Sequence, residues 1–212
     1  MNSEDHTGIW SEIIAPELDK LAATSSSKVL DAAISEINLA LTSKEKFELT
    51  VENVEALCLA VFRALSQCPF DLQLRQQALQ MLSAVLTLDF EVYSFRFCKF
   101  LLALSTRNGA PSEAIILMEW IAFLAERLAS EGDLKDITEE LTPAAINLFS
   151  NMSLHFGEGY YRDQHKRRIF SKFVSTLLLF YRAILTKQPN SVSELVSTIE
   201  KKKLSVNGRI AQ

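Results

Sequence analysis

The spacing of apolar residues constrains the fold of this chain more than any other feature. Apolar side chains recur every three or four residues, and no segment shows the strict alternation of a half-buried strand. Two segments show the helical spacing clearly: Val54, Leu57, Cys58, Val61, Phe62 and Leu65, and then Leu74, Ala78, Met81, Leu82, Val85 and Leu86. Each set forms one apolar stripe on a helix. The sequence therefore predicts an all-α protein.

Start and stop signals divide this pattern into about nine helices. We predict them at residues 8–23, 25–42, 50–67, 71–88, 90–107, 111–130, 133–156, 163–188 and 191–204. Pro16 is expected to bend or restart the first helix, because proline lacks a backbone donor and clashes with the preceding turn. The predicted N-caps or first-turn acids are Asp71, Ser112, Asp133, Asp163 and Ser191.

The distance between helix starts indicates how the helices are arranged. Counted from Ser25, every second predicted helix start falls at residues 25, 71 and 111. The two separations, about 46 and about 40 residues, are close to the two-helix period of HEAT and armadillo repeats. We therefore predict a HEAT/armadillo-like solenoid of antiparallel helices. It would occupy residues 1–212 as a single helical-repeat segment, and a single closed bundle is the alternative.

The width of the apolar arcs favours the solenoid, because its inner helices are covered on both sides by neighbouring units. The helix that holds Trp120 is apolar nearly all round, and Glu119 and Glu126 mark its narrow polar face. On the helix that follows Arg168, about half the circumference is apolar at 100° per residue. That arc contains Ile169, Phe170, Phe173, Val174, Leu177, Leu178, Phe180, Tyr181, Ile184 and Leu185.

Composition excludes several classes of protein. With 48% hydrophobic residues the chain can bury a core, which excludes a disordered tail. The first residues, MNSEDHTGIW, lack the basic and apolar regions of a signal peptide, and no run reaches eighteen apolar residues. We expect a cytoplasmic protein without membrane contact. Cys58, Cys68 and Cys98 show no metal-ligand spacing and are predicted to be reduced packing residues.

Motifs of nucleotide-binding, hydrolase and metalloprotease sites are missing from the sequence. The histidines, His6, His155 and His165, are too far apart in sequence to suggest a ligand set. We predict no catalytic, metal-binding or cofactor-binding residues and a protein that is not an enzyme. The aromatic residues Phe90, Tyr93, Phe95, Phe97, Phe100 and Trp120 are expected in the core, with a peptide-binding groove as the alternative.

Charge is distributed unevenly along the chain. Residues 1–50 carry four Lys/Arg against nine Asp/Glu, residues 51–159 carry seven against fourteen, and residues 160–212 carry eleven against three. A basic C-terminal quarter on an acidic body suggests a polyanionic partner at one end. The overall pI of 5.5 argues against a protein that coats nucleic acid along its whole length.

The basic residues of YYRDQHKRRIFSK, residues 160–172, stand at the start of a predicted helix. The helix dipole disfavours cations there by about 0.3–1 kcal/mol each, and such a local conflict is typical of a functional site. Arg168, Lys172 and Arg182 also fall within about 80° of each other on the helical wheel, opposite the apolar arc. The predicted contacts to phosphate or ribosome are Arg162, Lys166, Arg167, Arg168, Lys172 and Arg182.

Two other readings of the basic quarter stay open. A solvated basic face that keeps the protein soluble would also explain the cluster of residues 160–172. Lys201, Lys202 and Lys203 lie at a predicted helix C-terminus, where cations complement the dipole, and need no functional explanation. If phosphate is bound, RNA is favoured, because the chain lacks a DNA-reading motif.

Short stretches of the sequence resemble a known family. These are Trp10-Ser11-Glu12-Ile13, Pro16-Glu17-Leu18-Asp19-Lys20, Met118-Glu119-Trp120-Ile121 and His165-Lys166-Arg167-Arg168-Ile169-Phe170. In this order they resemble the extreme N-terminus of the large fungal HEAT-repeat activator of the general amino-acid control kinase, which phosphorylates translation initiation factor two. The resemblance spans nearly the whole chain, although the internal Pro/Asp/Arg pattern of regular HEAT units is not visible.

The resemblance implies an N-terminal segment of a much longer solenoid. It implies a non-catalytic scaffold that associates with ribosomes and serves translational control in the amino-acid starvation response. The kinase and ATP-binding-cassette partners of the family are expected outside this segment, beyond residue 212. The alternative is a helical-repeat adaptor of trafficking or transport that binds only proteins. Within the first reading, ribosomal RNA and an acidic ribosomal protein both remain possible partners of the basic quarter.

Overall fold

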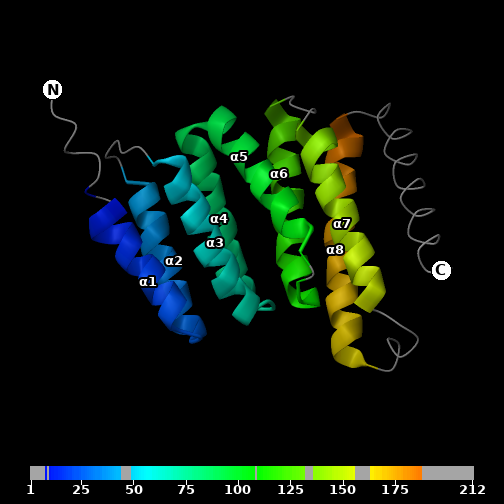
Figure 1. The fold of residues 1–212 in the computed structure, drawn as a ribbon, viewed down its shortest axis with the longest axis horizontal. Coiled ribbons are helices and arrows are strands. Elements are labelled where there is room, and N and C mark those ends of the chain that lie inside the picture. Colours follow the sequence, from blue (N-terminus) through cyan, green and yellow to red (C-terminus); the bar gives the residue numbers. More distant parts are fainter. Residues whose placement is uncertain are drawn as a thin grey trace. The chain divides into compact units, whose positions relative to one another are not determined.

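The computed structural model describes residue 8 and residues 10–43, 49–107, 109–131, 136–155 and 163–187 (Figure 1). The described residues form eight α-helices and contain no strand. The helices are α1 (Ala15–Ala23), α2 (Ser27–Leu41), α3 (Val51–Gln67), α4 (Leu72–Leu88), α5 (Phe90–Ser105), α6 (Pro111–Glu131), α7 (Thr142–His155) and α8 (Gln164–Lys187). Two π-helical turns, η1 (Trp10–Ile14) and η2 (Ile137–Leu141), precede α1 and α7. The prediction of an all-α protein is confirmed.

The number of helices differs from the predicted nine. Eight α-helices are described, and the ninth predicted helix, 191–204, lies outside the described residues. Pro16 restarts the first helix as predicted, because η1 ends at Ile14 and α1 begins with proline in its first turn. Proline fits there, since the first backbone N–H groups of a helix have no partner within it.

Two of the predicted caps are in place. The Asp71 carboxylate accepts a hydrogen bond from the backbone N–H of Leu74 at 3.1 Å, and Asp163 caps α8. The prediction for Ser112 is wrong, because α6 begins at Pro111 and the Glu113 carboxylate accepts from the N–H of Ala110 at 3.2 Å instead. Asp133 and Ser191 lie outside the described residues.

The chain divides into two compact units, Met1–Phe97 and Cys98–Gln212. In the first unit, α2 packs against α4, and α1 packs against both α2 and α3 (Figure 1). The core of this unit is formed by fully buried aliphatic residues such as Leu30, Ile34, Leu57, Leu74 and Met81. Helices two positions apart in the chain therefore lie side by side.

Polar side chains join α2 to α4 along this contact. Ser27 donates a hydrogen bond to the Asp71 carboxylate, and the Gln73 amide donates to Asp31 at 2.8 Å. Further along, Asn38 donates to the backbone carbonyl of Gln77 at 3.0 Å. The paired residues are 44, 42 and 39 positions apart in the sequence. Because polar pairs need defined partners, these bonds fix how the two helices align.

The second unit is built on α6. This helix packs against α8 and α7 (Figure 1). Trp120, at the centre of α6, is 0% exposed. The prediction that Trp120 lies in the core is confirmed. Ser105 in α5 accepts hydrogen bonds from two side chains of α7, Asn147 at 3.4 Å and Asn151 at 3.3 Å. Lys99 of α5 forms an ion pair with Glu140 of η2.

Removing the hydroxyl of Ser27 should raise the pKa of Asp71. The Ser27 hydrogen bond is the largest cause that holds this pKa below its usual value of 3.8, and the N–H of Leu74 is the next. In Ser27→Ala we expect the pKa of Asp71 to move toward 3.8, which carboxyl-carbon NMR titration would measure. Ser26→Ala is the control, because Ser26 precedes α2 without a side-chain capping bond. Equal Asp71 titrations in both variants would contradict the link between α2 and α4.

The same bond makes stability depend on pH in acid. Since the folded pKa of Asp71 is depressed, the unfolded chain binds the proton more readily, and stability rises with pH. The contribution is complete above the usual pKa of 3.8 and is lost as the pH falls through the lower folded pKa. The free energy of unfolding should therefore differ less between pH 5 and pH 2 in Ser27→Ala than in the unaltered protein, since such a group titrates in roughly this range.

Candidate functional site

The start of α8 carries the described part of the predicted basic site. Asp163 begins the helix: its carboxylate accepts from the backbone N–H groups of His165 at 2.9 Å and Lys166 at 3.1 Å. Its own carbonyl accepts from the N–H of Arg167 at 3.0 Å. The N–H of Lys166 is the largest cause that holds the pKa of Asp163 below its usual range, so the cap is an anion. The negative cap stabilises the helix start.

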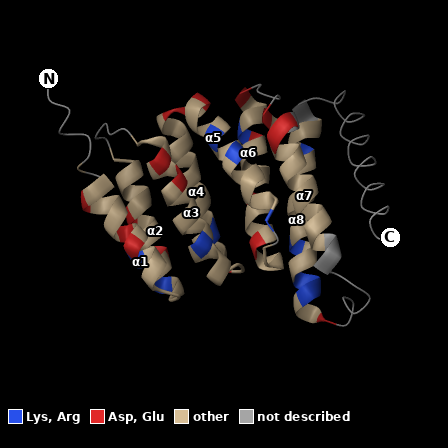
Figure 2. Cartoon of the chain, in the orientation of Figure 1, with Lys and Arg blue, Asp and Glu red and all other residues tan. Residues whose placement is uncertain are grey.

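The first turn of α8 is exposed on every side. Residues 164–168 are all exposed, and Ile169, at 5% exposure, is the first buried residue of the helix. We call Lys166, Arg167, Arg168 and Lys172 the basic end of α8; Lys172, one turn further along, is half-buried. Figure 2 shows Lys and Arg gathered where the chain enters α8. The structure thus brings four of the six predicted site residues together.

Asp163 reduces the electrostatic conflict that the sequence suggested. Cations at a helix N-terminus are disfavoured by the dipole, but a carboxylate among the first N–H groups supplies the opposite charge. The Asp163 pKa is lowered further by the positive charge of Lys166, after the backbone hydrogen bonds. Attraction between this lysine and the cap therefore offsets part of the unfavourable dipole contact. The exposure of these cations is therefore better evidence for a binding site than their unfavourable contact with the helix dipole.

Arg182 lies apart from the basic end of α8. It is exposed and shares a face with Arg168, as predicted, but it stands about four turns, or roughly 21 Å, further along the helix axis. Leu178, Leu179 and Leu185 surround it and are 63%, 56% and 44% exposed. Arg162 lies outside the described residues. The structure thus places Arg182 among exposed leucines rather than among cations.

Two residues of the expected apolar arc of α8 are exposed rather than buried. Phe173, Phe180 and Ile184 are buried as expected, with exposures of 0%, 0% and 2%. Leu178 and Leu185, which the helical wheel assigned to the same arc, are exposed. On the helical wheel the buried residues lie at one edge of this arc, and Leu178 and Leu185 lie at the opposite edge. The buried contact of α8 therefore takes up only one side of the arc.

The aromatic residues of α5 divide between core and surface. Tyr93 and Phe97 are buried as predicted, whereas Phe95 is 44% exposed, so the core assignment is wrong for Phe95. The Tyr93 hydroxyl donates to the carbonyl of Leu49 at 2.7 Å, which satisfies its polar group within the core. Burial with a satisfied hydroxyl is a packing role, and it favours the core interpretation of Tyr93 over a peptide-binding groove.

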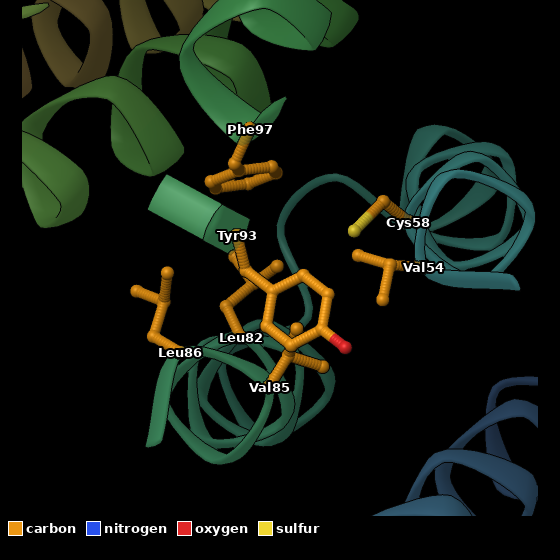
Figure 3. Close-up of a pocket in the computed structure, with 7 residues that line it drawn as sticks. All are labelled: Val54, Cys58, Leu82, Val85, Leu86, Tyr93 and Phe97. Carbon is orange, nitrogen blue, oxygen red and sulfur yellow. The ribbon is translucent and has the colours of Figure 1, made fainter. Parts of the chain in front are cut away.

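A small apolar cavity lies beside Tyr93 in the first unit (Figure 3). Its volume is about 10 Å³, and its lining consists of Val54, Cys58, Leu82, Val85, Leu86, Tyr93 and Phe97. Space of this size holds at most about one water molecule, and an apolar lining gives such a water few partners. Burial raises the pKa of the Cys58 thiol to about 12, so the thiol stays protonated. The cavity is a packing gap rather than a ligand site.

None of the three cysteines forms a disulfide, and Cys58 and Cys98 are buried, as the sequence predicts for reduced packing residues. Within the described ranges, no group of three or more His, Cys, Asp and Glu side chains could hold a metal ion. None of the helices in the described part of the chain has the length and hydropathy needed to cross a membrane. The basic end of α8 is therefore the best-supported candidate site in the described residues.

A scan against protein-family models found no match, and searches of curated proteins and of solved structures found none either. The family resemblance read from the sequence stays a prediction. Function must be argued from the chemistry of the site itself.

The anionic cap of α8 can be tested directly. Asp163→Ala should speed amide hydrogen exchange at His165 and Lys166, because both N–H groups lose their carboxylate acceptor. Asp163→Asn is the matched control, since an asparagine oxygen can still accept those bonds without the charge. We expect its exchange rates to lie between those of Asp163→Ala and the unaltered protein, by mass spectrometry or NMR. Unchanged exchange in Asp163→Ala would contradict the capping geometry.

Proposed function

We propose that this chain is a non-catalytic helical scaffold segment that docks on ribosomes through the basic end of α8 and acts in translational control. One observation carries the proposal: four cations surround an exposed helix start in a chain whose net charge is −4. Lys and Arg side chains neutralise the phosphate groups of nucleic acids, and ribosomal RNA presents such groups densely. The family resemblance of residues 165–170 supports the same partner.

The arrangement of the helices supports a HEAT/armadillo-like solenoid as the scaffold. Helices two positions apart pack together in both units, α2 with α4 and α6 with α8. The polar links between helices join residues 39 to 46 positions apart, such as Asn38 with Gln77 and Asn151 with Ser105. This separation agrees with the period of about 40–47 residues in two-helix repeats. A segment of this kind would present the start of α8 as part of a longer surface.

Binding to ribosomes should weaken as salt rises. Each phosphate that a cation neutralises releases counterions, so the logarithm of the binding constant falls linearly with the logarithm of salt concentration. For about four phosphate contacts we expect a slope of roughly −3 to −4 at about 0.7–0.9 per contact. Co-sedimentation with purified ribosomes over a salt series measures the slope. Failure to co-sediment at low salt would overturn the proposal.

A second candidate function is a protein-binding adaptor of trafficking or transport without nucleic-acid contact. The exposed Leu178, Leu179 and Leu185 favour it, because several large apolar side chains exposed close together are typical of a protein contact surface. The variant Arg182→Glu distinguishes the two functions.

If ribosome binding depends on the basic end of α8 alone, Arg182→Glu should change the salt slope by much less than the value expected for one phosphate contact. A partner that loses its affinity with Leu179→Glu and is insensitive to salt would favour the adaptor.

A further inference from the structure

Ser171 lies in the middle of the exposed face of α8, within the basic end of that helix. It is exposed, and on a helical wheel it stands about 180° from the mean direction of buried Ile169 and Phe173. Arg167 and Arg168 stand one turn earlier, about 40° to one side of Ser171 and about 60° to the other. Residues three and four apart on a helix are neighbours, so both guanidinium groups can reach a group that the Ser171 hydroxyl carries.

The residues before Ser171 have the charge pattern of a kinase substrate. Kinases choose among serines partly by the charges that surround the hydroxyl, and an arginine three residues before the serine is a common requirement. Here Arg168 stands three residues before Ser171, Arg167 four and Lys166 five. A kinase with an acidic substrate groove would therefore bind this segment.

Two other serines also follow an arginine by three residues, but their surroundings differ. Neither Ser66 nor Ser130 has a second cation beside that arginine, and each hydroxyl donates to a carbonyl of its own helix at 2.8 Å. Each also directly follows two buried residues. Among residues 164–171, by contrast, Ile169 alone is buried, and helix ends open at low cost. A kinase that needs an extended substrate would therefore reach Ser171 most easily.

We propose that Ser171 is a phosphorylation site, and that phosphate there prevents the basic end of α8 from binding RNA. A bond forms between the Ser171 Oγ and the terminal phosphorus of a nucleoside triphosphate, the nucleoside diphosphate leaves, and the hydroxyl proton passes to the kinase. The product carries a charge of about −1.5 to −2 at pH 7 and accepts hydrogen bonds from Arg167 and Arg168. Two of the four cations are then paired within the chain. This effect on binding rests on the proposed function, whereas the modification of Ser171 does not.

Treatment of the full chain with ATP and a purified calmodulin-dependent kinase, which selects arginine three residues before serine, tests the modification. We expect phosphate mainly on Ser171, located by tandem mass spectrometry, with Ser66 and Ser130 modified more slowly. In Arg168→Gln the rate at Ser171 should fall at least about tenfold, because the selected arginine is lost. Equal rates in both proteins would overturn the site. So would an unmodified Ser171 under conditions that phosphorylate a peptide of residues 163–175.

Phosphoserine incorporated at position 171 during synthesis tests the effect on binding without a kinase. The salt slope of ribosome co-sedimentation should become shallower by roughly 1.5–2 units, for two contacts at about 0.7–0.9 each. Phosphoserine at exposed Ser130 is the matched control, because it adds the same charge outside α8 and should leave the slope nearly unchanged. Equal slopes for the two phosphorylated chains would overturn the effect on binding and leave the modification in place.

Phosphorus NMR measures the pairing of the phosphate independently of ribosomes. Nearby cations favour the doubly charged phosphate, so its second pKa, about 6 without such partners, should be lower at position 171 than at position 130. Equal pKa values at the two positions would overturn the pairing with Arg167 and Arg168. If the unaltered chain does not bind ribosomes at any salt concentration, the proposed function fails, while the kinase reaction and the pKa comparison still decide the modification and the pairing.

Discussion

Replacing Trp120 with alanine should lower the free energy of unfolding by about 3–5 kcal/mol, the range for deleting a large buried aromatic side chain. Trp120 is 0% exposed at the centre of α6, and its neighbours on that helix, Met118 and Ile121, are also fully buried. Removal of the indole leaves a cavity that surrounding helices can fill only in part. Chemical denaturation of the full chain measures the loss as a lower midpoint with a similar slope.

Phe149→Ala is the matched control for this experiment. Phe149 is also an aromatic residue of the second unit, but it is 43% exposed on α7, so its truncation leaves a smaller cavity. We expect a much smaller loss of stability than for Trp120→Ala. If both variants unfold at the midpoint of the unaltered protein, Trp120 is not a core residue, and the packing of α6 described above is wrong.

The helices could be predicted because each one needs an apolar stripe of period 3.6 to pack on its neighbours. Trp120 could be placed in the core for a related reason: its helix is apolar nearly all round, and such a helix is stable only when it is covered. Asp71 and Asp163 were predictable as caps, since a carboxylate before an apolar run satisfies the first backbone N–H groups. The π-helical turns η1 and η2 have no comparable signal in the sequence.

The surface of α8 could not be predicted, because the helical wheel shows which residues are apolar but not how much of the helix its partner covers. Leu178 and Leu185 belong to the same apolar arc as Phe173 and Phe180, yet only the two phenylalanines are buried. The same limit applies to Phe95, which lies beside buried Ser94 and remains 44% exposed on α5. Exposure depends on the width of each tertiary contact, which a single helix does not encode.

The candidate site was predictable in its composition and only partly in its geometry. A run of cations at a predicted helix start identifies Lys166, Arg167 and Arg168 from the sequence alone. The wheel also groups Arg182 with them, because it projects the helix along its axis and ignores a separation of roughly 21 Å. The compensating role of Asp163 depends on the hydrogen bonds of its carboxylate to the N–H groups of His165 and Lys166.

Reversing the charge of the basic end of α8 should remove most of the affinity for ribosomes. In the variant Arg167→Glu, Arg168→Glu and Lys172→Glu, three attractive phosphate contacts become repulsive. The negative slope of the binding constant against salt should therefore become shallower by about three units. Stability should change little, because Arg167 and Arg168 are exposed and Lys172 is half-buried. Glutamate near a helix start is also favoured by the dipole.

A triple reversal elsewhere on the chain separates local binding from net charge. Lys28, Arg63 and Arg107 are exposed and lie outside α8, so Lys28→Glu, Arg63→Glu and Arg107→Glu change the net charge by the same amount. If general attraction between the protein and the ribosome caused the binding, both triple variants would lose affinity equally. If the basic end of α8 binds phosphate, the control should retain most of the affinity and a slope close to that of the unaltered chain.

Co-sedimentation of the unaltered chain and both triple variants with purified ribosomes, across one salt series, tests the proposed function most directly. We predict a steep loss of binding with salt for the unaltered chain and for the control reversal, and weak, nearly salt-independent binding for the α8 reversal. Equal binding of all three proteins at every salt concentration would contradict a role of the basic end of α8 in contacting phosphate.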